Sequence, residues 1–199
     1  MRQLVLLEHT SLDGFVAGPK GEFDGFEASE ENLLFVCQLA RQADTILSGR
    51  ITFELLDGDW PTKKDRPGAS EAEIAFSNWY NGAKKIVISK TLPQKNSRNV
   101  TVIGDHVFET ISGVKQEDGK DILVFGSPAT AQSLMGLGLV DSYWIFVNPV
   151  IFGEGIPLFT RLPKRIRLRI VATRQFENGE LAINYVADHS EPRMARSRY

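Results

Sequence analysis

The sequence predicts a single three-layer α/β/α domain whose mainly parallel, mixed sheet ends in an antiparallel C-terminal hairpin. Apolar runs of strand length alternate with helical patterns through most of the 199 residues, which is typical of an α/β domain. Asn178-Gly179 separates the last two strand patterns and is a strong hairpin signal. Because no linker or repeat interrupts the pattern, we expect one domain over residues 1–187 and a polar, basic tail over residues 188–199.

The first half of the chain is expected to begin with a buried strand and a long loop. Leu4–Leu7 is a continuous apolar run, and Thr10–Glu27 is rich in glycine, aspartate and proline. Ser29 is a candidate N-cap for a helix whose apolar stripe runs to Ala40. Later patterns predict a strand at 45–47, a helix at 51–56, a loop at 57–69, a helix at 71–80 and strands at 85–89 and 99–103.

The second half is expected to add two strands to the sheet before the hairpin. A helical pattern at 107–114 precedes the buried strand Asp121–Phe125, after which Ser127-Pro128 favours a helix start. Tyr143–Ile151 is a strongly apolar strand that Asn148-Pro149 interrupts. The predicted hairpin consists of a strand at 164–176, a turn at 177–180 and a strand at 181–186.

The charge balance argues against nucleic-acid binding. The 23 basic and 25 acidic residues give a net charge of −2, so no general basic field is present. Arg161–Arg174 is a basic exception, and its alternation indicates a strand with one solvated basic face, a polyanion site being the alternative. The one cysteine, Cys37, lies in an apolar helical run and is expected in the core. We expect no metal site.

The location is expected to be cytoplasmic. A single cysteine forms no internal disulfide, which favours a reducing compartment. The N-terminal apolar run is shorter than the core of a signal peptide, and no apolar stretch approaches the roughly 20 residues needed to cross a bilayer. We therefore expect no membrane partner.

Three predicted strand ends carry residues suited to phosphate. In an open α/β sheet, ligands gather beyond the carboxyl ends of the strands. The segments 124–130 and 46–54 each pass from a strand through glycine into a helix, and the second places Arg50 at the helix start. Ser89 and Lys90 end a third strand. These ends predict a dinucleotide with an extra phosphate, NADPH rather than NADH; ordinary strand–helix turns and a surface ion pair of Arg50 are the alternatives.

Five segments in this order also resemble the dihydrofolate reductase superfamily. They are SLDGFVAG (11–18), SGRITFE (48–54), KIVISKTL (85–92), VFGSPATAQSLM (124–135) and GLVDSYWIFVNPVIFGEGIPLF (138–159). The sequence most resembles stand-alone domains similar to the C-terminal reductase domain of the bifunctional riboflavin-biosynthesis deaminase–reductase. The resemblance implies a dihydrofolate reductase-like sheet and NADPH as the cofactor. The deaminase half would need a cysteine pair in its zinc signature, so the reductase alone is expected.

The resemblance implies a set of cofactor-binding residues. Three of its segments would bind the phosphates of NADPH, and one would lie beside the nicotinamide. Asp13-Gly14 would start the loop that covers the nicotinamide. The implied residues are Gly49, Arg50 and Thr52 for the cofactor phosphate, Ser89 and Lys90 for the adenosine phosphate, Gly126, Ser127, Ala129 and Thr130 for the pyrophosphate, and Val16 and Ala17 for the nicotinamide.

The expected function is an NADPH-dependent reductase that transfers a hydride to a small heterocyclic substrate of pyrimidine or pterin type. An NADPH-binding sensor or interaction module without turnover is the alternative, and a scaffold without cofactor is a third reading. Trp60 is a candidate substrate contact, packing alone being the other reading. Relatives of this type are often dimers, and the apolar run Tyr143–Val147 has large side chains on both faces, so we expect a homodimer, with a core-only role as the alternative.

The proton source is the open question of the predicted mechanism. Glu8 ends the first strand, close in sequence to the presumed nicotinamide contact, where burial would raise its pKa toward a useful value; an exposed strand-end acid is the alternative. Asp13 is the second catalytic candidate, although a loop aspartate also holds loops by side-chain-to-backbone bonds. His9 is a further donor or a structural histidine, and direct donation from water is compatible with the sequence.

Overall fold

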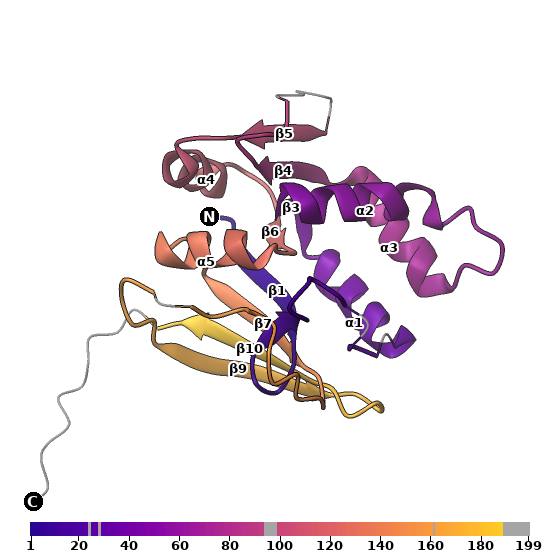
Figure 1. Cartoon of the computed structure of the whole chain (residues 1–199). Coiled ribbons are helices and arrows are strands. Elements are labelled where there is room, and N and C mark those ends of the chain that lie inside the picture. Colours follow the sequence, from indigo (N-terminus) through magenta and orange to yellow (C-terminus); the bar gives the residue numbers. More distant parts are fainter. Residues whose placement is uncertain (24, 28, 94–98, 161, 189–199) are drawn as a thin grey trace, which may run out of the picture.

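The computed structural model describes residues 1–23, 25–27, 29–93, 99–160 and 162–188, and these form the expected three-layer α/β/α domain (Figure 1). The described residues build a mixed eight-stranded sheet in the order β5-β4-β3-β6-β1-β7-β10-β9 and a separate pair, β2-β8. The strands are β1 (Leu4–Thr10), β2 (Phe15–Ala17), β3 (Ala43–Gly49), β4 (Lys84–Ile88), β5 (Val100–Ile103), β6 (Asp121–Val124), β7 (Ser142–Val147), β8 (Ile156–Pro157), β9 (Leu168–Gln175) and β10 (Leu181–Ala187).

The first six strands of the large sheet are parallel, and the last two form the antiparallel hairpin. β1 pairs with β6 and β7, so that Leu6 lies between Val124 and Tyr143. β10 pairs antiparallel with β7 and with β9. The parallel half therefore presents all of its carboxyl ends at one edge, where the predicted strand-end residues lie.

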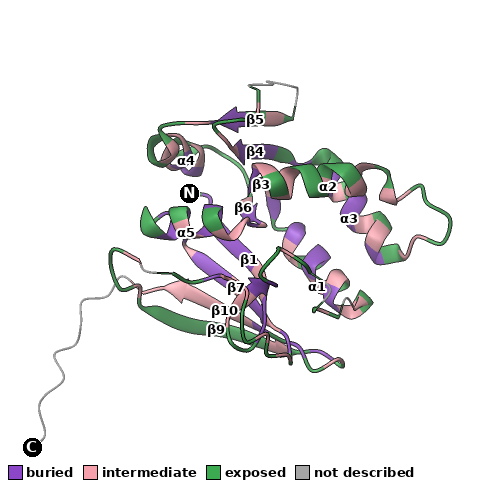
Figure 2. Cartoon of the chain, in the orientation of Figure 1, coloured by how far each residue is buried: buried purple, intermediate pink, exposed green. Residues whose placement is uncertain are grey.

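Helices cover both faces of this sheet (Figure 1). On one face lie α1 (Glu30–Ala40), α2 (Arg50–Lys63) and α3 (Glu71–Gly82), and on the other lie α4 (Val107–Gln116) and α5 (Pro128–Gly136). Figure 2 shows the central strands as buried. The side chains that are completely excluded from solvent include Leu4, Leu6, Leu47, Ile122, Val124 and Leu134.

Local signals start the helices where the sequence predicts them. The Ser29 hydroxyl accepts the amide N–H of Asn32, which caps α1. Ser70 and Glu73 form a reciprocal capping box at α3. Cys37 is 4% exposed in the core, as predicted, and burial raises the pKa of its thiol.

The loop predicted from residue 57 is wrong at its start, because α2 continues to Lys63 and includes Pro61. Packing against α3 stabilises this extra length. The Trp60 ring lies 4.4 Å from the Phe76 ring, measured between centroids, and Ser77 donates a hydrogen bond to the carbonyl of Trp60. These contacts offset the backbone bond that a proline removes from a helix.

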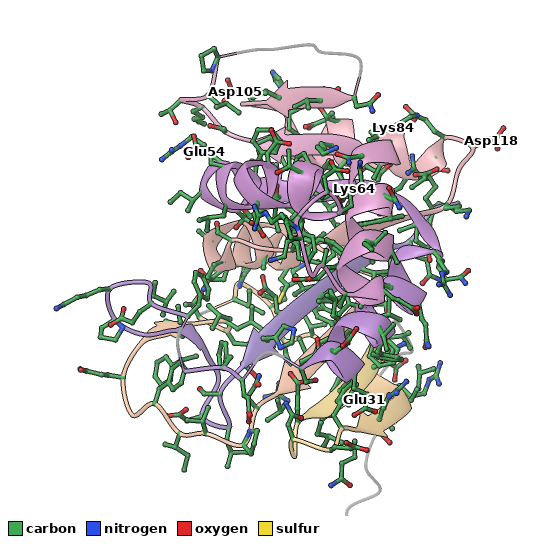
Figure 3. The ribbon with its side chains drawn as sticks, turned by 90° about the vertical axis from the view of Figure 1, so that its right-hand side faces the viewer. Glu31, Glu54, Lys64, Lys84, Asp105 and Asp118 are labelled. Carbon is green, nitrogen blue, oxygen red and sulfur yellow. The ribbon has the colours of Figure 1, made fainter. Side chains whose placement is uncertain are left out.

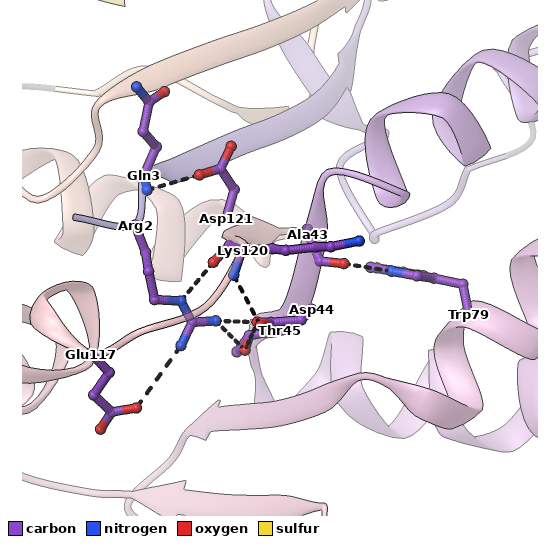
Figure 4. A network of polar contacts seen from close by, with 9 residues as sticks. All are labelled: Arg2, Gln3, Ala43, Asp44, Thr45, Trp79, Glu117, Lys120 and Asp121. Carbon is purple, nitrogen blue, oxygen red and sulfur yellow. Dashed lines mark hydrogen bonds and ion pairs between the residues drawn. The ribbon is translucent and has the colours of Figure 1, made fainter.

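The amino ends of the central strands are held by a buried arginine (Figure 4). Arg2 is 3% exposed and forms an ion pair with Asp44, a hydrogen bond to the Thr45 hydroxyl and a 2.6 Å bond from Nε to the carbonyl of Lys120. Its distance to the Glu117 carboxylate is 3.9 Å. Arg2 therefore joins the start of β1 to β3 and to the residue before β6, at the edge of the sheet opposite the predicted site.

The hairpin differs from the prediction in where it is exposed. β9 begins at Leu168, so the basic alternation at 165–167 precedes the strand, and nearly all of β9 is exposed on both faces (Figure 2). β7 ends before Asn148 and lies inside the sheet, with Phe146 fully buried, which fits the core-only reading of that run. The homodimer stays a prediction. The predicted tail, except Asp188, lies outside the described residues.

No helix among the described residues combines the length and the hydropathy of a membrane span.

Candidate active site

The three predicted strand ends lie on neighbouring strands. β3 lies between β4 and β6, with Gly49 opposite Ile88 and Leu47 opposite Val124. The Gly49 amide N–H donates to the carbonyl of Gly126 over 3.0 Å, which joins two of the turns directly. In Figure 3, Asp105, just after β5, lies to the left of Lys84, at the start of β4, so the carboxyl ends of these strands face away from their amino ends. Arg50, Ser89 and Thr130 thus follow neighbouring strands at one edge.

The turns at Gly49 and Gly126 approach each other so closely that a side chain does not fit. A Cβ on Gly49 would lie 2.5 Å from the Thr130 hydroxyl oxygen and 3.0 Å from that of Ser127. Gly126 has φ +80°, a conformation that favours glycine, and its peptide bond to Ser127 is cis. Because both positions are glycine, each turn presents backbone groups and no side chain at this point.

Both turns end at helix starts without a side-chain cap. Gly49 precedes α2 and Ser127 precedes α5, and neither makes a cap hydrogen bond through a side chain. The Ser127 hydroxyl lies 3.3 Å from that of Thr130 instead. The first amide N–H groups of a helix have no partner inside it, so two adjacent sets of free donors and two positive dipole ends meet here. Such a pair suits the phosphates of a bound anion.

The basic side chains at these ends are exposed and paired with acids. Arg50 Nη1 lies 2.8 Å from the Glu54 carboxylate, and Lys90 Nζ lies 3.3 Å from that of Asp105. Exposed pairs of this kind contribute little to stability, so both cations are free to exchange partners. The Ser89 hydroxyl accepts the amide N–H groups of Thr91 and Leu92 and closes its own turn.

A cavity of about 800 Å³ opens next to these turns, between β1, the end of β6 and helices α1 to α3. Six of the predicted site residues line it: Glu8, Val16, Thr52, Trp60, Gly126 and Ser127. The other predicted residues, including Ala17 and Ala129, do not line it. The sequence reasoning missed the apolar wall that α1, α3 and the end of β6 supply, which includes Leu33, Val36, Phe76 and Phe125.

Glu8 is the chemically unusual group in this cavity. Its Oε1 oxygen is buried and has no hydrogen-bond partner among the described residues. Burial raises the pKa of Glu8 to about 8, so the carboxyl group is largely neutral at pH 7. A Cβ on Gly126 would lie 2.7 Å from Oε1, which places the acid directly against the turn that follows β6. A neutral acid in that position can donate a proton.

His9 belongs to a buried polar group that sequence reasoning did not find. The imidazole Nδ1 lies 2.8 Å from Oε1 of Glu180, and the ring stacks on Phe146. Glu180 is 1% exposed and accepts a further hydrogen bond from the Asn32 side chain. Glu180 follows the Asn178-Gly179 turn, and only the fold brings it to α1, so no local signal predicts its role.

Asp13 does not line the cavity and joins its own loop to the loop at Phe152 and Gly153. Its carboxylate accepts the Ser11 hydroxyl over 2.6 Å and the amide N–H groups of Phe152 and Gly153 over 3.1 and 2.8 Å. These bonds, with that from Ser11 the largest, lower the pKa of Asp13 and keep it ionised. The geometry favours the loop-holding role over proton donation.

Replacing Asp13 with alanine is expected to speed hydrogen exchange of the Phe152 and Gly153 amides by about tenfold, the equivalent of a charge-assisted hydrogen bond. Residue-resolved exchange at neutral pH measures it. Glu154→Ala removes a neighbouring carboxylate and should leave both rates unchanged. Equal rates in wild type and Asp13→Ala would contradict the holding role.

The large sheet has a parallel half followed by an antiparallel pair, and the cavity lies where the chain leaves the neighbouring strands β1 and β6. This arrangement is that of dihydrofolate reductase-like domains. The chain belongs to the family described as the RibD C-terminal domain, whose model matches residues 2–182. It is 33% identical over 184 residues to the uncharacterized protein YyaP of Bacillus subtilis, covering 92% of this chain and 94% of YyaP.

Solved structures share the fold at low identity. One is the diaminohydroxyphosphoribosylaminopyrimidine deaminase/5-amino-6-(5-phosphoribosylamino)uracil reductase of Thermotoga maritima, with TM-score 0.65, 16% identity and coverage of 94% of this chain and 57% of that one. Another is dihydrofolate reductase from Enterococcus faecalis complexed with NADP(H), with TM-score 0.62, 18% identity and coverage of 94% and 96%. Family and fold together support an oxidoreductase, a reductase of the riboflavin-pathway type.

Proposed function

We propose that the protein is an NADPH-dependent reductase that transfers a hydride to a small heterocyclic substrate of pyrimidine or pterin type. The observation that carries the proposal is the unpartnered, buried Glu8 oxygen against the Gly126 turn, in a cavity beside two uncapped helix starts. The likeness to a reductase of a phosphoribosylaminouracil and to a dihydrofolate reductase complexed with NADP(H) supports both the cofactor and the substrate type.

The residues present fit the proposed cofactor. Gly49 and Gly126 let the two turns pack closely on Thr130, Ser127 and Glu8, so that the Thr130 and Ser127 hydroxyls lie beside the free amides of two helix starts. Arg50 and Lys90 would supply the charge for the extra phosphate of NADPH, with Ser89 beside them. Val16, which lines the cavity, would contact the nicotinamide. When bound, NADPH supplies the hydride.

Glu8 would supply the proton that accompanies the hydride. The cavity wall keeps water from its Oε1 oxygen, so the carboxyl stays protonated near pH 7 and gives up the proton as negative charge develops on the substrate. Trp60 and the neighbouring apolar side chains would orient the substrate ring. Asp13 would hold the covering loop in place.

Calorimetric titration and NADPH oxidation test the function. We expect NADPH to bind more tightly than NADH and to raise the Tm, and at least one compound in a panel of pterins, pyrimidines and quinonoid rings to consume NADPH. Binding without turnover of any of them would favour the sensor alternative, and no binding of NADPH would overturn the proposal.

Arg50→Ala is expected to weaken NADPH more than NADH by about 1.5–3 kcal/mol, the scale of a charge-assisted contact. Titration calorimetry with both cofactors measures the difference. Glu54→Gln is the matched control, because it removes the present partner of Arg50 and keeps the guanidinium. It should not weaken NADPH. Equal weakening of NADPH and NADH by Arg50→Ala would contradict the assignment of Arg50 to the extra phosphate.

A further inference from the structure

We propose that the substrate of this cavity is a flat, apolar ring compound that is neutral or cationic and carries no phosphate group. The inference rests on the proposed function and names the substrate class more closely. It separates the proposed substrate from that of the Thermotoga maritima reductase, whose name specifies a phosphoribosyl compound.

The charges around the cavity argue against an anionic substrate. Among the described residues that line it, Lys63 is the only lysine or arginine, whereas Glu27, Glu30 and Glu73 contribute carboxylates. Lys63 is already paired, with Nζ 3.1 Å from Asp59 and 3.3 Å from Glu73. A phosphate monoester here would meet acids and no free cation, at a cost that a low-dielectric wall increases.

The His9 side chain of the wall also has a partner already. His9 lines the cavity through a ring whose Nδ1 is held by the buried Glu180 carboxylate. Arg50 starts α2, two residues before Thr52 of the cavity wall, and the proposed function assigns it to the cofactor. The charge available to a substrate in the cavity is therefore negative.

The apolar part of the wall fits a planar ring. Trp60, Phe76 and Phe125 lie in contact, with centroid distances of 4.4 Å between Trp60 and Phe76 and 6.0 Å between Phe76 and Phe125. Phe23 and Phe26, which lie between β2 and α1 in the chain, also line the cavity, and Phe23 is 59% exposed. Aromatic faces bind flat rings by stacking, and an electron-rich face also attracts a cationic ring.

Three flat fluorescent probes test the substrate class in the presence of saturating NADP⁺, which occupies the cofactor turns and permits no turnover. Riboflavin is neutral, riboflavin 5′-phosphate differs only in its phosphate, and proflavine is cationic. We expect riboflavin and proflavine to bind and the phosphate to bind at least about tenfold more weakly than riboflavin.

Charge reversal at the rim sharpens the test. Glu30 is exposed in the first turn of α1, and Glu30→Lys should raise the affinity for riboflavin 5′-phosphate relative to riboflavin by about threefold to tenfold at low salt, less at high salt. Glu109→Lys makes the same change in the first turn of α4, away from the cavity, and should leave the ratio unchanged.

The outcomes separate the two proposals. Equal binding of riboflavin and its phosphate, or no binding of any probe, overturns the substrate class while NADPH binding keeps the proposed function. A ratio that shifts equally in Glu30→Lys and Glu109→Lys also overturns the substrate class, since net charge alone then explains it. Failure of NADP⁺ and NADPH to bind overturns both.

Discussion

Replacing Glu8 with glutamine is expected to lower kcat by about a hundredfold while NADPH affinity stays within about threefold, because the amide keeps the shape of the acid and cannot supply its proton. In the wild type, kcat should fall as the pH rises through about 8, where Glu8 ionises. Steady-state kinetics from pH 5 to pH 10 with a substrate from the panel measures both effects.

Glu8→Gln is also expected to change how the free energy of unfolding depends on pH. The folded protein keeps a proton on Glu8 between the ordinary pKa of 4.5 and its raised pKa of about 8, whereas the unfolded chain loses it. The free energy of unfolding therefore falls as the pH rises through this range, by about 3–6 kcal/mol. The variant should lack this slope and be the more stable protein above the range, as urea unfolding below, within and above it would show.

His9→Gln is the control for the proton source. It changes the titratable group next to Glu8 in the chain, which also lines the cavity, and leaves Glu8 in place. If the loss of activity above pH 8 disappears in His9→Gln and persists in Glu8→Gln, the proton comes from His9. Unchanged kcat in Glu8→Gln would mean that water donates directly.

Gly126→Ala is expected to abolish NADPH binding at millimolar cofactor and to destabilise the fold by about 2 kcal/mol. Its positive φ of 80° disfavours a side chain, and the new Cβ would lie 2.7 Å from Oε1 of Glu8. The methyl group would force Glu8 or the turn itself to move, which would displace the backbone amides proposed to bind phosphate. Calorimetry for binding and urea unfolding for stability measure the two losses.

Gly138→Ala separates the two causes. Gly138 has φ +70° and open space where a Cβ would lie, far along the chain from the turn. It should lose about 1 kcal/mol of stability from the backbone conformation alone and bind NADPH normally. If Gly126→Ala binds NADPH as tightly as Gly138→Ala, the Gly126 turn is not part of the cofactor site.

Local signals were sufficient for most of the fold. Apolar runs, the Ser29 cap and the Asn178-Gly179 turn give the strands, the first helix and the hairpin, since each depends on neighbours in the chain. The course of α2 through Pro61 was missed, because only the packing of Trp60 on α3 stabilises it. The short β2 and β8 strands were missed for the same reason, as each pairs only with the other.

The candidate site divides in the same way. The glycine turns and Arg50 follow strand ends directly, so chain position places them, and parallel strands bring their ends together. The burial of Glu8 was anticipated only as a condition for catalysis. The Glu8 oxygen without a hydrogen-bond partner and the contact between His9 and Glu180 both depend on segments that are distant in the chain. A local sequence pattern does not predict such contacts.

The pairing of β2 with β8 joins two segments from opposite halves of the chain into one two-stranded unit. The Leu158 amide donates to the carbonyl of Gly14, and the Leu12 amide donates to that of Val150. Because Val16 of β2 lines the cavity, any shift of β2 away from it would break these bonds or carry β8 along. Substitutions within residues 150–158 are therefore expected to change the dissociation rate of a ligand in the cavity, although these residues are far from Glu8 in the sequence.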